Sequence, residues 1–411
     1  MATIGIIAIG SHGDVAPLTG LGVRLQHAGH RVTMVAYQMF AELVIGCGLD
    51  FRPLADGGAA LGDVSPLDAV KGLARFLSPS GMRALGSQVL AAVHDEPFDV
   101  LLLSPFAEPA GHPLAEALSI PSVGVRLQPL SATGDHPPSV LGAWSAGRRT
   151  NRAAARVGET VLDALYGKTI NGFRAELELP NVPARSLRRQ RTDARWPILY
   201  GYSPTVLPRP ADWRPGIEVV GYWWPARPSG WQPSAELTAF LDAGPAPVVI
   251  GFGSTVNSRA AAEKISGVIR DAVQVAGARA VVQSGWAGLD VAGDDVLCVG
   301  EVPHDWLFTR AAVVVHHCGA GTTAAGLRAG VPAVAVPAMG DQPFWARRLA
   351  ELGASPAPIP QRRLTSENLG AAIRAAMTDN GFRTNAARVS DHMQAEDGAG
   401  RVLKLVEELL A

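Results

Sequence analysis

Residues 316–345 read HHCGAGTTAAGLRAGVPAVAVPAMGDQPFW. The apolar run Val313–Val315 leads into two histidines, a glycine-threonine turn and a helix-like segment, and a second apolar run, Pro332–Pro337, ends at Gly340-Asp341-Gln342. This order of strand, turn, helix and strand is typical of a parallel α/β sheet, in which neighbouring strands end at the same edge. We therefore expect the histidine, the turn and the acid–amide pair to lie close together at one edge of a sheet.

The same alternation of short apolar runs and longer amphipathic segments occurs in both halves of the chain. Strands rich in Val, Ile and Leu and separated by helices indicate parallel sheets covered on both faces. The pattern predicts two doubly wound domains with a cleft between them. The strand candidates are Ile4–Ile9, Arg31–Ala36, Val100–Leu103, Ser122–Leu127, Val248–Phe252, Ala280–Gln283, Val296–Val299, Val313–His316 and Ala333–Val336.

The middle of the chain interrupts this alternation. Val140–Leu177 reads as one long helix, and the Pro/Arg-rich segment after it reads as irregular. The arginines from Arg185 to Arg195 favour a solvated surface loop over a site for anionic lipid or an acidic acceptor. Residues 209–234 hold too many prolines for a helix or a central strand. We predict a first domain over 1–208, a connection over 209–234, a second domain over 235–390 and a terminal segment over 391–411.

Composition limits the functions that the chain can have. The 411 residues include 47% apolar residues, enough for two cores, and the net charge of −1 argues against nucleic acid as a partner. Cys47, Cys298 and Cys318 are too far apart in sequence for a disulfide framework or a metal cluster, which fits a reducing cytosol. The N-terminus lacks a basic region and no apolar stretch could span a bilayer. We expect a cytoplasmic protein without a transmembrane segment, for which contact with a membrane surface is left open.

The turn after Val315 has the features of a diphosphate site. Glycines let the backbone approach a ligand, and a helix N-terminus presents free N–H groups and partial positive charge. His317 could add an imidazole donor, and the upstream loop could add Ser254. A tight turn without a ligand is the alternative, whereas the glycine spacing excludes a dinucleotide fingerprint and a P-loop. The turn consists of Gly319, Ala320, Gly321, Thr322 and Thr323.

Two acidic residues stand at the ends of predicted strands. Asp341 with Gln342 could accept and donate hydrogen bonds to the hydroxyls of a sugar, although Asp341 could instead cap the next helix. In the loop GSHGDVAPL, residues 10–18, Asp14 could take a proton from an attacking hydroxyl. Its neighbour His12 is the competing base, because its free pKa is nearer neutral. Asp14 could also serve only as a helix cap near Val15.

Residues 302–349 resemble the nucleotide-sugar signature of GT-B family 1 glycosyltransferases, and most of all that of bacterial natural-product and sterol glucosyltransferases. The blocks PHDWLF, HHxGAGTT, RAGVP and GDQPFW match in order and spacing. GSHGDVAPL at 10–18, VVGYWW at 219–224 and VVIGFGS at 248–254 extend the resemblance over nearly the whole chain. It implies a GT-B fold: two Rossmann-like domains facing a cleft, the acceptor on the first, the donor on the second, and a C-terminal helix that crosses back to the first.

The resemblance also implies roles for individual residues. Asp14 is expected to be the catalytic base, with His12 as the competitor. His317, the turn of residues 319–323 and Ser254 are expected to hold the diphosphate, and Asp341 and Gln342 the donor sugar. The nucleoside-binding candidates are the backbone around Val302 and Trp286. The acceptor-binding candidates, which could equally be core or structural residues, are His112, Phe76, Met82 and Trp144.

Two positions depart from the family pattern. Many relatives carry an aromatic residue that stacks on the base where this chain has Glu301, so stacking could fall to Trp286. Plant relatives carry a ribose-binding Glu where this chain has Ala325. The second departure leaves open whether the donor is a uridine or a thymidine diphosphate sugar.

The combined reading is an inverting, metal-independent glycosyltransferase that uses no cofactor besides its nucleotide-sugar donor. It would move a hexose, with glucose favoured, from a UDP- or TDP-sugar to a hydroxyl of an apolar acceptor. The Arg- and Ala-rich, Lys-poor composition indicates a GC-rich bacterium, so a polyketide or macrolide is the first acceptor expected and a sterol the second. The alternatives are a nucleotide-sugar epimerase or hydrolase, and a non-catalytic nucleotide-sugar-binding protein.

Overall fold

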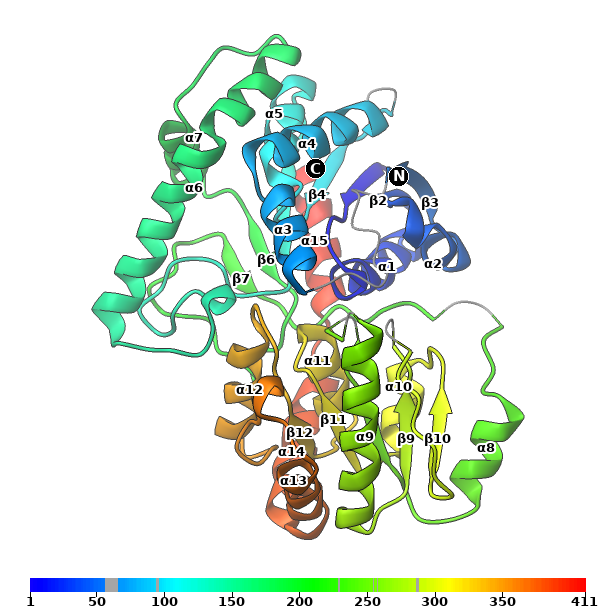
Figure 1. The fold of residues 1–411 in the computed structure, drawn as a ribbon. Helices are drawn as coiled ribbons and strands as arrows, with labels where there is room; N and C mark the ends of the chain where they lie inside the picture. Colours follow the sequence, from blue (N-terminus) through cyan, green and yellow to red (C-terminus); the bar gives the residue numbers. More distant parts are fainter. Residues whose placement is uncertain (56–65, 94–95, 228–229, 254, 257, 286–287) are drawn as a thin grey trace.

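The protein folds into two α/β halves, which lie one above the other in Figure 1. The computed structural model describes residues 1–55, 66–93, 96–227, 230–253, 255–256, 258–285 and 288–411. Each half contains one sheet whose strands are all parallel within this described part. The predicted class, two doubly wound α/β domains, is therefore confirmed.

Among the described residues, the first sheet has seven strands in the order β3-β2-β1-β4-β5-β6-β7. The central strands are buried on both faces, because helices cover the sheet from both sides. Ile4 and Ile6 contribute to one core cluster, while Ile7 and Ile9 contribute to the cluster on the opposite face. The strands are β1 Thr3–Ile7, β2 Arg31–Tyr37, β3 Asp50–Leu54, β4 Val100–Leu103, β5 Ser122–Arg126, β6 Ile198–Tyr200 and β7 Ile217–Val219.

The second sheet has five strands in the part of the chain that the structure describes, in the order β10-β9-β8-β11-β12. β11 pairs in parallel with β12, and His316 at the end of β11 is in register with Ala335. The two strand ends therefore share one edge, as the sequence predicted. The strands are β8 Val248–Gly251, β9 Ala280–Gln283, β10 Val296–Val299, β11 Val313–His316 and β12 Ala333–Ala335.

Helices connect the strands and cover both sheets (Figure 1). None of the helices that the structure describes has the length and apolar content needed to cross a bilayer. In the first half they are α1 His12–His27, α2 Ala41–Gly46, α3 Pro66–Phe76, α4 Pro79–Val93, α5 Glu108–Leu118, α6 Arg148–Glu176 and α7 Ala184–Asp193. The remaining helices are α8 Ala235–Asp242, α9 Arg259–Ala276, α10 His304–Leu307, α11 Ala320–Arg328, α12 Gln342–Glu351, α13 Ser366–Thr378, α14 Asn380–Gln394 and α15 Gly398–Leu410.

The last helix, α15, leaves the second half and packs on the first. Val402 and Val406 are fully buried in the same cluster as Ile4, Ile6 and Leu21. α14, immediately before it, packs on α11 of the second half. The chain therefore crosses between the halves at residues 395–397, and the prediction of a terminal helix that crosses back is confirmed.

Two segments differ from the sequence-based expectation. The arginine-rich residues 185–195 were expected to form a loop, but most of them belong to α7. Arg188 from α7 binds Asp163 on α6 at 2.8 Å, and Glu159 on α6 at 3.3 Å. These ion pairs explain how so basic a segment is held as a helix. The proline-rich residues 209–234 include β7, which adds an edge strand to the first sheet.

The docking of α15 yields a test of stability. Val406→Asp would bury a carboxylate without a partner, and we expect it to lower the free energy of unfolding by at least about 3 kcal/mol. Leu409→Asp is the matched control, because Leu409 lies on the same helix and is 37% exposed. Urea denaturation followed by circular dichroism measures both changes. Equal losses in the two variants would contradict the packing described for α15.

Candidate active site

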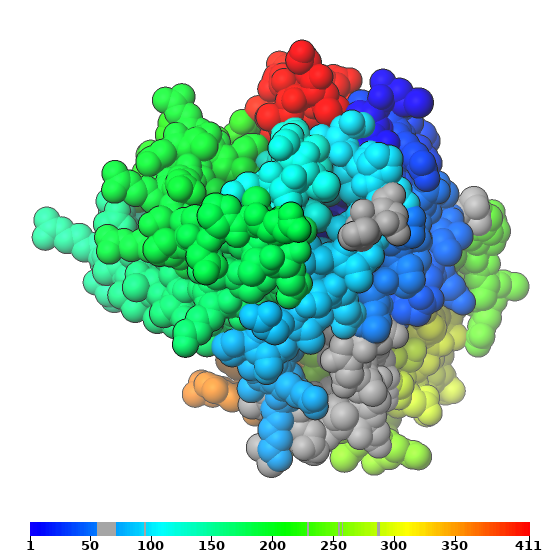
Figure 2. Space-filling model, turned by 90° about the horizontal axis from the view of Figure 1, so that it is seen from above, coloured from blue at the N-terminus to red at the C-terminus, as the bar shows by residue number. Residues whose placement is uncertain are grey.

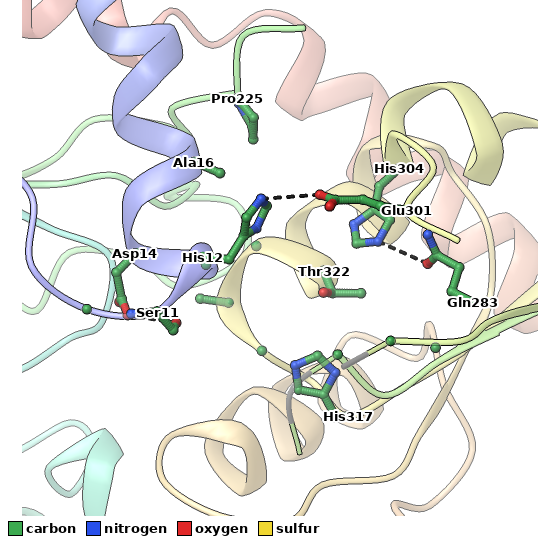
Figure 3. Close-up of a pocket in the computed structure, with 18 of the residues that line it drawn as sticks. Ser11, His12, Asp14, Ala16, Pro225, Gln283, Glu301, His304, His317 and Thr322 are labelled. Atoms are coloured by element: carbon green, nitrogen blue, oxygen red, sulfur yellow. Dashed lines mark hydrogen bonds and ion pairs between the residues drawn. The ribbon is translucent and has the colours of Figure 1, made fainter. Parts of the chain in front are cut away.

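A cleft of about 3020 Å³ lies between the two halves, where the carboxyl ends of their strands face each other. Figure 3 shows side chains from both halves pointing into it. α1 contributes its first turn, and α11 and α12 contribute their starts. Of the predicted site residues, those that line the cleft are His12, Asp14, Phe76, Val302, His317, Gly319, Ala320, Gly321, Thr322, Asp341 and Gln342.

The turn between β11 and α11 presents free backbone donors to this cleft. The first intrahelical bond runs from the Thr323 N–H to the Gly319 carbonyl, so the N–H groups of residues 320–322 precede the helical ladder. The Cys318 N–H donates to His316 Nδ1 at 3.1 Å and holds the tight turn, in which Cys318 has φ 66°. Burial lowers the pKa of His316 to about 3, so its ring stays neutral and Nδ1 can accept this bond.

The His317 imidazole is enclosed by two glycine loops. A Cβ atom at Gly319 would lie 2.7 Å from its Nε2, and a Cβ at Gly253 would lie 3.1 Å from its Cε1. Burial lowers the pKa of His317 to about 4, so the ring is neutral near pH 7. The Thr323 hydroxyl is buried without a hydrogen-bond partner in the described part of the chain. Unpaired polar groups of this kind suit a polar ligand at the start of α11.

Asp341 and Gln342 lie together at the start of α12. Asp341 occupies the position before the helix, but its side chain makes no capping bond; instead Trp345 Nε1 donates to its Oδ2 at 2.9 Å. Burial raises the pKa of Asp341 to about 6, the Trp345 bond opposes that rise, and the charge of Asp14 adds to it. The Gln342 side-chain oxygen accepts from the Ala338 and Met339 N–H groups. Within the part of the chain that the structure describes, its amide NH₂ group remains available to a ligand.

Asp14 both caps α1 and faces the cleft. The Ser11 N–H and hydroxyl donate to its Oδ2 at 2.8 and 2.9 Å, which forms a capping box with Asp14 as the third residue of the helix. Gln128 Nε2 donates to the other oxygen at 3.1 Å. Asp14 is therefore a helix-capping residue, as the alternative interpretation predicted. The same side chain also lines the cleft, so the two positions are compatible. Three donors fix the orientation of this carboxylate.

His12 spans the cleft to the second half. Its Nε2 lies 3.3 Å from Glu301 Oε1, as the dashed line in Figure 3 shows. The hydrogen bond from His12 lowers the pKa of Glu301. Beside this pair, Gln283 Nε2 donates a hydrogen bond to the Val302 carbonyl oxygen at 3.1 Å. Its Oε1 lies within hydrogen-bond distance of His304 Nε2, at 3.2 Å. The His12 side chain is thus already engaged across the cleft, whereas the hydrogen bonds that Asp14 accepts from described residues come from Ser11 and Gln128 of its own half.

Sequence reasoning did not identify Gln128 and Gln283. Both lie at or just after the ends of strands, Gln283 as the last residue of β9 and Gln128 two residues after β5. The carboxyl end of a parallel strand was therefore the available signal. Their partners are 114 and 19 residues away in sequence, which no local pattern reveals.

The acceptor candidates lie in different surroundings. Phe76 lines the cleft, together with Phe40, Leu43, Phe106 and Leu127. Met82 is a correction: it is 2% exposed and belongs to the core beneath α4. The two other corrections are His112 and Trp144, neither of which lines the cleft. The His112 ring packs on the Trp196 ring with 4.4 Å between the ring centroids, and Trp144 is 39% exposed.

Ser254 and Trp286, predicted for the diphosphate and the base, lie outside the described residues, so both roles stay predictions. Within the described ranges, no three His, Cys, Asp or Glu side chains come together as a metal site would require.

Sequence comparison identifies the family. Residues 271–409 match the family model described as Erythromycin biosynthesis protein CIII-like, C-terminal domain. The chain is 33% identical to O-mycaminosyltylonolide 6-deoxyallosyltransferase of Streptomyces fradiae, over 98% of this chain and 97% of that protein. The chain belongs to this family of glycosyltransferases. The present chain is also 33% identical to sterol 3-beta-glucosyltransferase UGT80A2 of Arabidopsis thaliana. The match covers 97% of the present chain but only 64% of the plant protein.

Solved structures of glycosyltransferases share the fold of this family member. The glycotransferase of kitacinnamycin aligns with a TM-score of 0.72 at 20% identity, over 100% of this chain and 99% of that chain. SsfS6 from Streptomyces sp. SF2575, solved with thymidine diphosphate, aligns with a TM-score of 0.63 at 20% identity, over 99% and 100% of the two chains. The GT-B architecture is therefore confirmed.

The contact between Trp345 and Asp341 yields a test of the site's electrostatics. Trp345→Phe removes a donor that stabilises the carboxylate, so we expect the pKa of Asp341 to rise above about 6. Carboxyl ¹³C NMR titration, with the signal assigned through Asp341→Asn, measures the midpoint. Trp306→Phe, at an indole that lies away from Asp341, is the control and should leave the midpoint unchanged. An unchanged midpoint in Trp345→Phe would refute the proposed influence of the indole.

Proposed function

We propose that the chain is an inverting glycosyltransferase that moves a hexose from a UDP- or TDP-sugar to a hydroxyl of an apolar acceptor. One observation carries the proposal. The cleft brings the Asp14 carboxylate of the first half opposite the unpaired amides of α11 and the Asp341 side chain of the second half. A proton acceptor thus faces a site for an anionic leaving group, as displacement from a diphosphate requires.

The donor diphosphate would bind at the start of α11. The free N–H groups of residues 320–322 and the helix dipole favour negative charge at this point. His317 adds a neutral imidazole donor, the Thr323 hydroxyl is unpaired, and Ser254 is the further candidate. These groups would stabilise the departing diphosphate without a metal ion.

The donor sugar would lie between α11 and α12. Asp341 has one carboxylate oxygen beyond the one bonded to Trp345, and Gln342 has a free amide NH₂ group. Together they offer an acceptor and donors to neighbouring hydroxyls, which favours a well-hydroxylated hexose such as glucose. The nucleoside would lie near Val302 and Trp286. Ala325 lines this side of the cleft and carries no carboxylate for the ribose, so both UDP- and TDP-sugars remain candidates.

The acceptor would lie against the apolar wall of the first half, next to Asp14. Its hydroxyl oxygen forms a bond to the anomeric carbon while the bond from that carbon to the phosphate oxygen breaks. The proton passes to the Asp14 carboxylate, and the bonding electron pair leaves with the diphosphate. Attack from the face opposite the diphosphate inverts the anomeric configuration.

The relatives support an apolar acceptor, since their names specify sterol and macrolide-derived substrates. We favour a polyketide or macrolide and place a sterol second. The scattered thiols and the composition support a cytoplasmic location. We further propose that residues 1–208 form the acceptor domain and 235–390 the donor domain.

The base assignment is tested by a pair of variants. Asp14→Asn should lower kcat by at least about 100-fold, because the proton has no acceptor, while donor affinity stays within about twofold. Asp341→Asn should mainly raise the KM for the donor. Kinetics with UDP-glucose and TDP-glucose and calorimetry with the diphosphates separate the two effects. His12→Gln is the control for the competing base; loss of kcat in this variant with full activity in Asp14→Asn would reverse the assignment.

The rival functions are separated by product analysis. Mass spectrometry after incubation with UDP-glucose, TDP-glucose and a library of lipophilic alcohols should detect a glycosylated alcohol. Donor consumption that needs no alcohol would indicate an epimerase or hydrolase. A donor that binds and remains intact in every mixture would indicate a non-catalytic binding protein.

A further inference from the structure

The helices α6 and α7 form a strongly basic part of the protein. They contain ten Lys and Arg residues and four Asp and Glu residues, a formal charge of +6, whereas the whole chain has a net charge of −1. The two helices lie at the outer edge of the first half, away from the interdomain cleft (Figure 1). Figure 2 shows the same green region projecting from one side of the molecule.

Four large apolar side chains are exposed on the same helix. Val157, Val161, Leu162 and Leu165 are 63%, 56%, 53% and 39% exposed. Val157, Val161 and Leu165 are four residues apart, so they share one face of α6. The opposite face packs on α4 and α5 through buried residues such as Tyr166 and Phe173. An exposed apolar row on a helix whose other face is already buried indicates a second contact surface.

Cations border this apolar row. Arg149 and Arg156 lie on the N-terminal side of the row, and Lys168 continues its face one turn beyond Leu165. All three are exposed, and no acidic group of the described chain lies within 4.0 Å of them. In contrast, Arg188, between α6 and α7, is paired with two acids. The cations next to the exposed apolar residues are therefore not neutralised by an ion pair within the described residues.

This combination points to an anionic lipid surface as the occupant. We propose that the α6 face, defined by Val157, Val161, Leu162, Leu165 and the cations beside them, docks the protein on membranes that contain anionic lipids. A basic helix with an exposed apolar row binds the membrane interface by burying the row among acyl chains while its cations meet lipid phosphates. The proposal does not depend on the proposed glycosyl transfer.

Charge argues against a second copy of the chain on this face. In an antiparallel pair of α6 helices centred on Val161, Lys168 of one copy would face the turn that contains Arg156 of the other. In a parallel pair, each Arg156 would face its counterpart. Both arrangements bring like charges together, whereas an anionic surface neutralises them.

The test is co-sedimentation of the full chain with vesicles of phosphatidylcholine alone or with about 30% phosphatidylglycerol. We expect partition onto the anionic vesicles to be at least about tenfold stronger than onto the neutral ones and to weaken as salt is raised. Partition that is equal on both lipids, or absent from both, would overturn the proposal.

Matched variants locate the surface. The triple change Val157→Ser, Val161→Ser, Leu165→Ser and the double change Arg149→Glu, Arg156→Glu should each lower the partition coefficient at least about tenfold. The apolar control is Leu118→Ser, Val275→Ser, Leu409→Ser, and the charge control is Arg362→Glu, Arg363→Glu, all at exposed positions outside α6 and α7. Equal losses in the controls would overturn the proposal.

Two further measurements distinguish membrane binding from self-association and from the proposed glycosyl transfer. Light scattering should find the same oligomeric state for the wild type and the triple variant; a dimer that the triple change converts to a monomer would assign the face to self-association and overturn the proposal. Turnover of a water-soluble acceptor should be unchanged in both variants. Failure of vesicle binding with intact turnover would refute the α6 inference alone, and absent turnover with intact vesicle binding would refute the proposed function alone.

Discussion

The enclosure of the His317 imidazole by Gly253 and Gly319 is the constraint on which the cleft depends. Those contacts leave no room for a Cβ atom at Gly319, so this position requires glycine and the backbone of the turn stays bare. The same packing buries the ring and lowers its pKa to about 4. The anion site that we propose here would therefore act through helix N–H groups rather than through a fixed cation. A bound diphosphate would raise the pKa of His317 by its own charge, so the imidazole would strengthen as a donor when the ligand arrives.

Much of the fold follows from sequence, because buried parallel strands are continuous apolar runs. Val100–Leu103, Ala280–Gln283 and Val296–Val299 have the bounds that the sequence predicts. β3 was missed because it is an edge strand that contains Pro53 and polar, exposed side chains. α7 was missed because its many arginines are typical of a solvent-exposed loop. The ion pairs of Arg188 with acidic side chains of α6, which stabilise the helix, are visible only in the structure. A local pattern cannot report a partner supplied by another element.

The cleft likewise contains residues that the sequence predicts and contacts that it does not. His317, the turn after it and Asp341 follow strands directly, so the edge of the sheet could be inferred from the strands. The contacts that orient them could not. Gln128 reaches Asp14 across 114 residues, and Glu301 reaches His12 from the other half of the molecule. The apolar wall of the cleft was the least predictable part, because Phe76 and Met82 have the same apolar character in sequence and only packing separates cleft from core.

Two of the carboxylates that line the cleft, Asp14 and Asp341, raise the question of which one accepts the proton. Burial raises the pKa of Asp341 to about 6, which would favour this carboxylate as a proton acceptor in the empty site if its surroundings stayed as they are. A donor sugar would change them, since its hydroxyls would hydrogen-bond the carboxylate and hold it in its ionised form. Asp14 lies on the half that carries the apolar wall, and its orientation is fixed by Ser11 and Gln128 before any ligand binds. Position on the proposed acceptor side is therefore the ground on which we propose Asp14 as the base, and the unequal surroundings would let two aspartates serve different steps of one reaction.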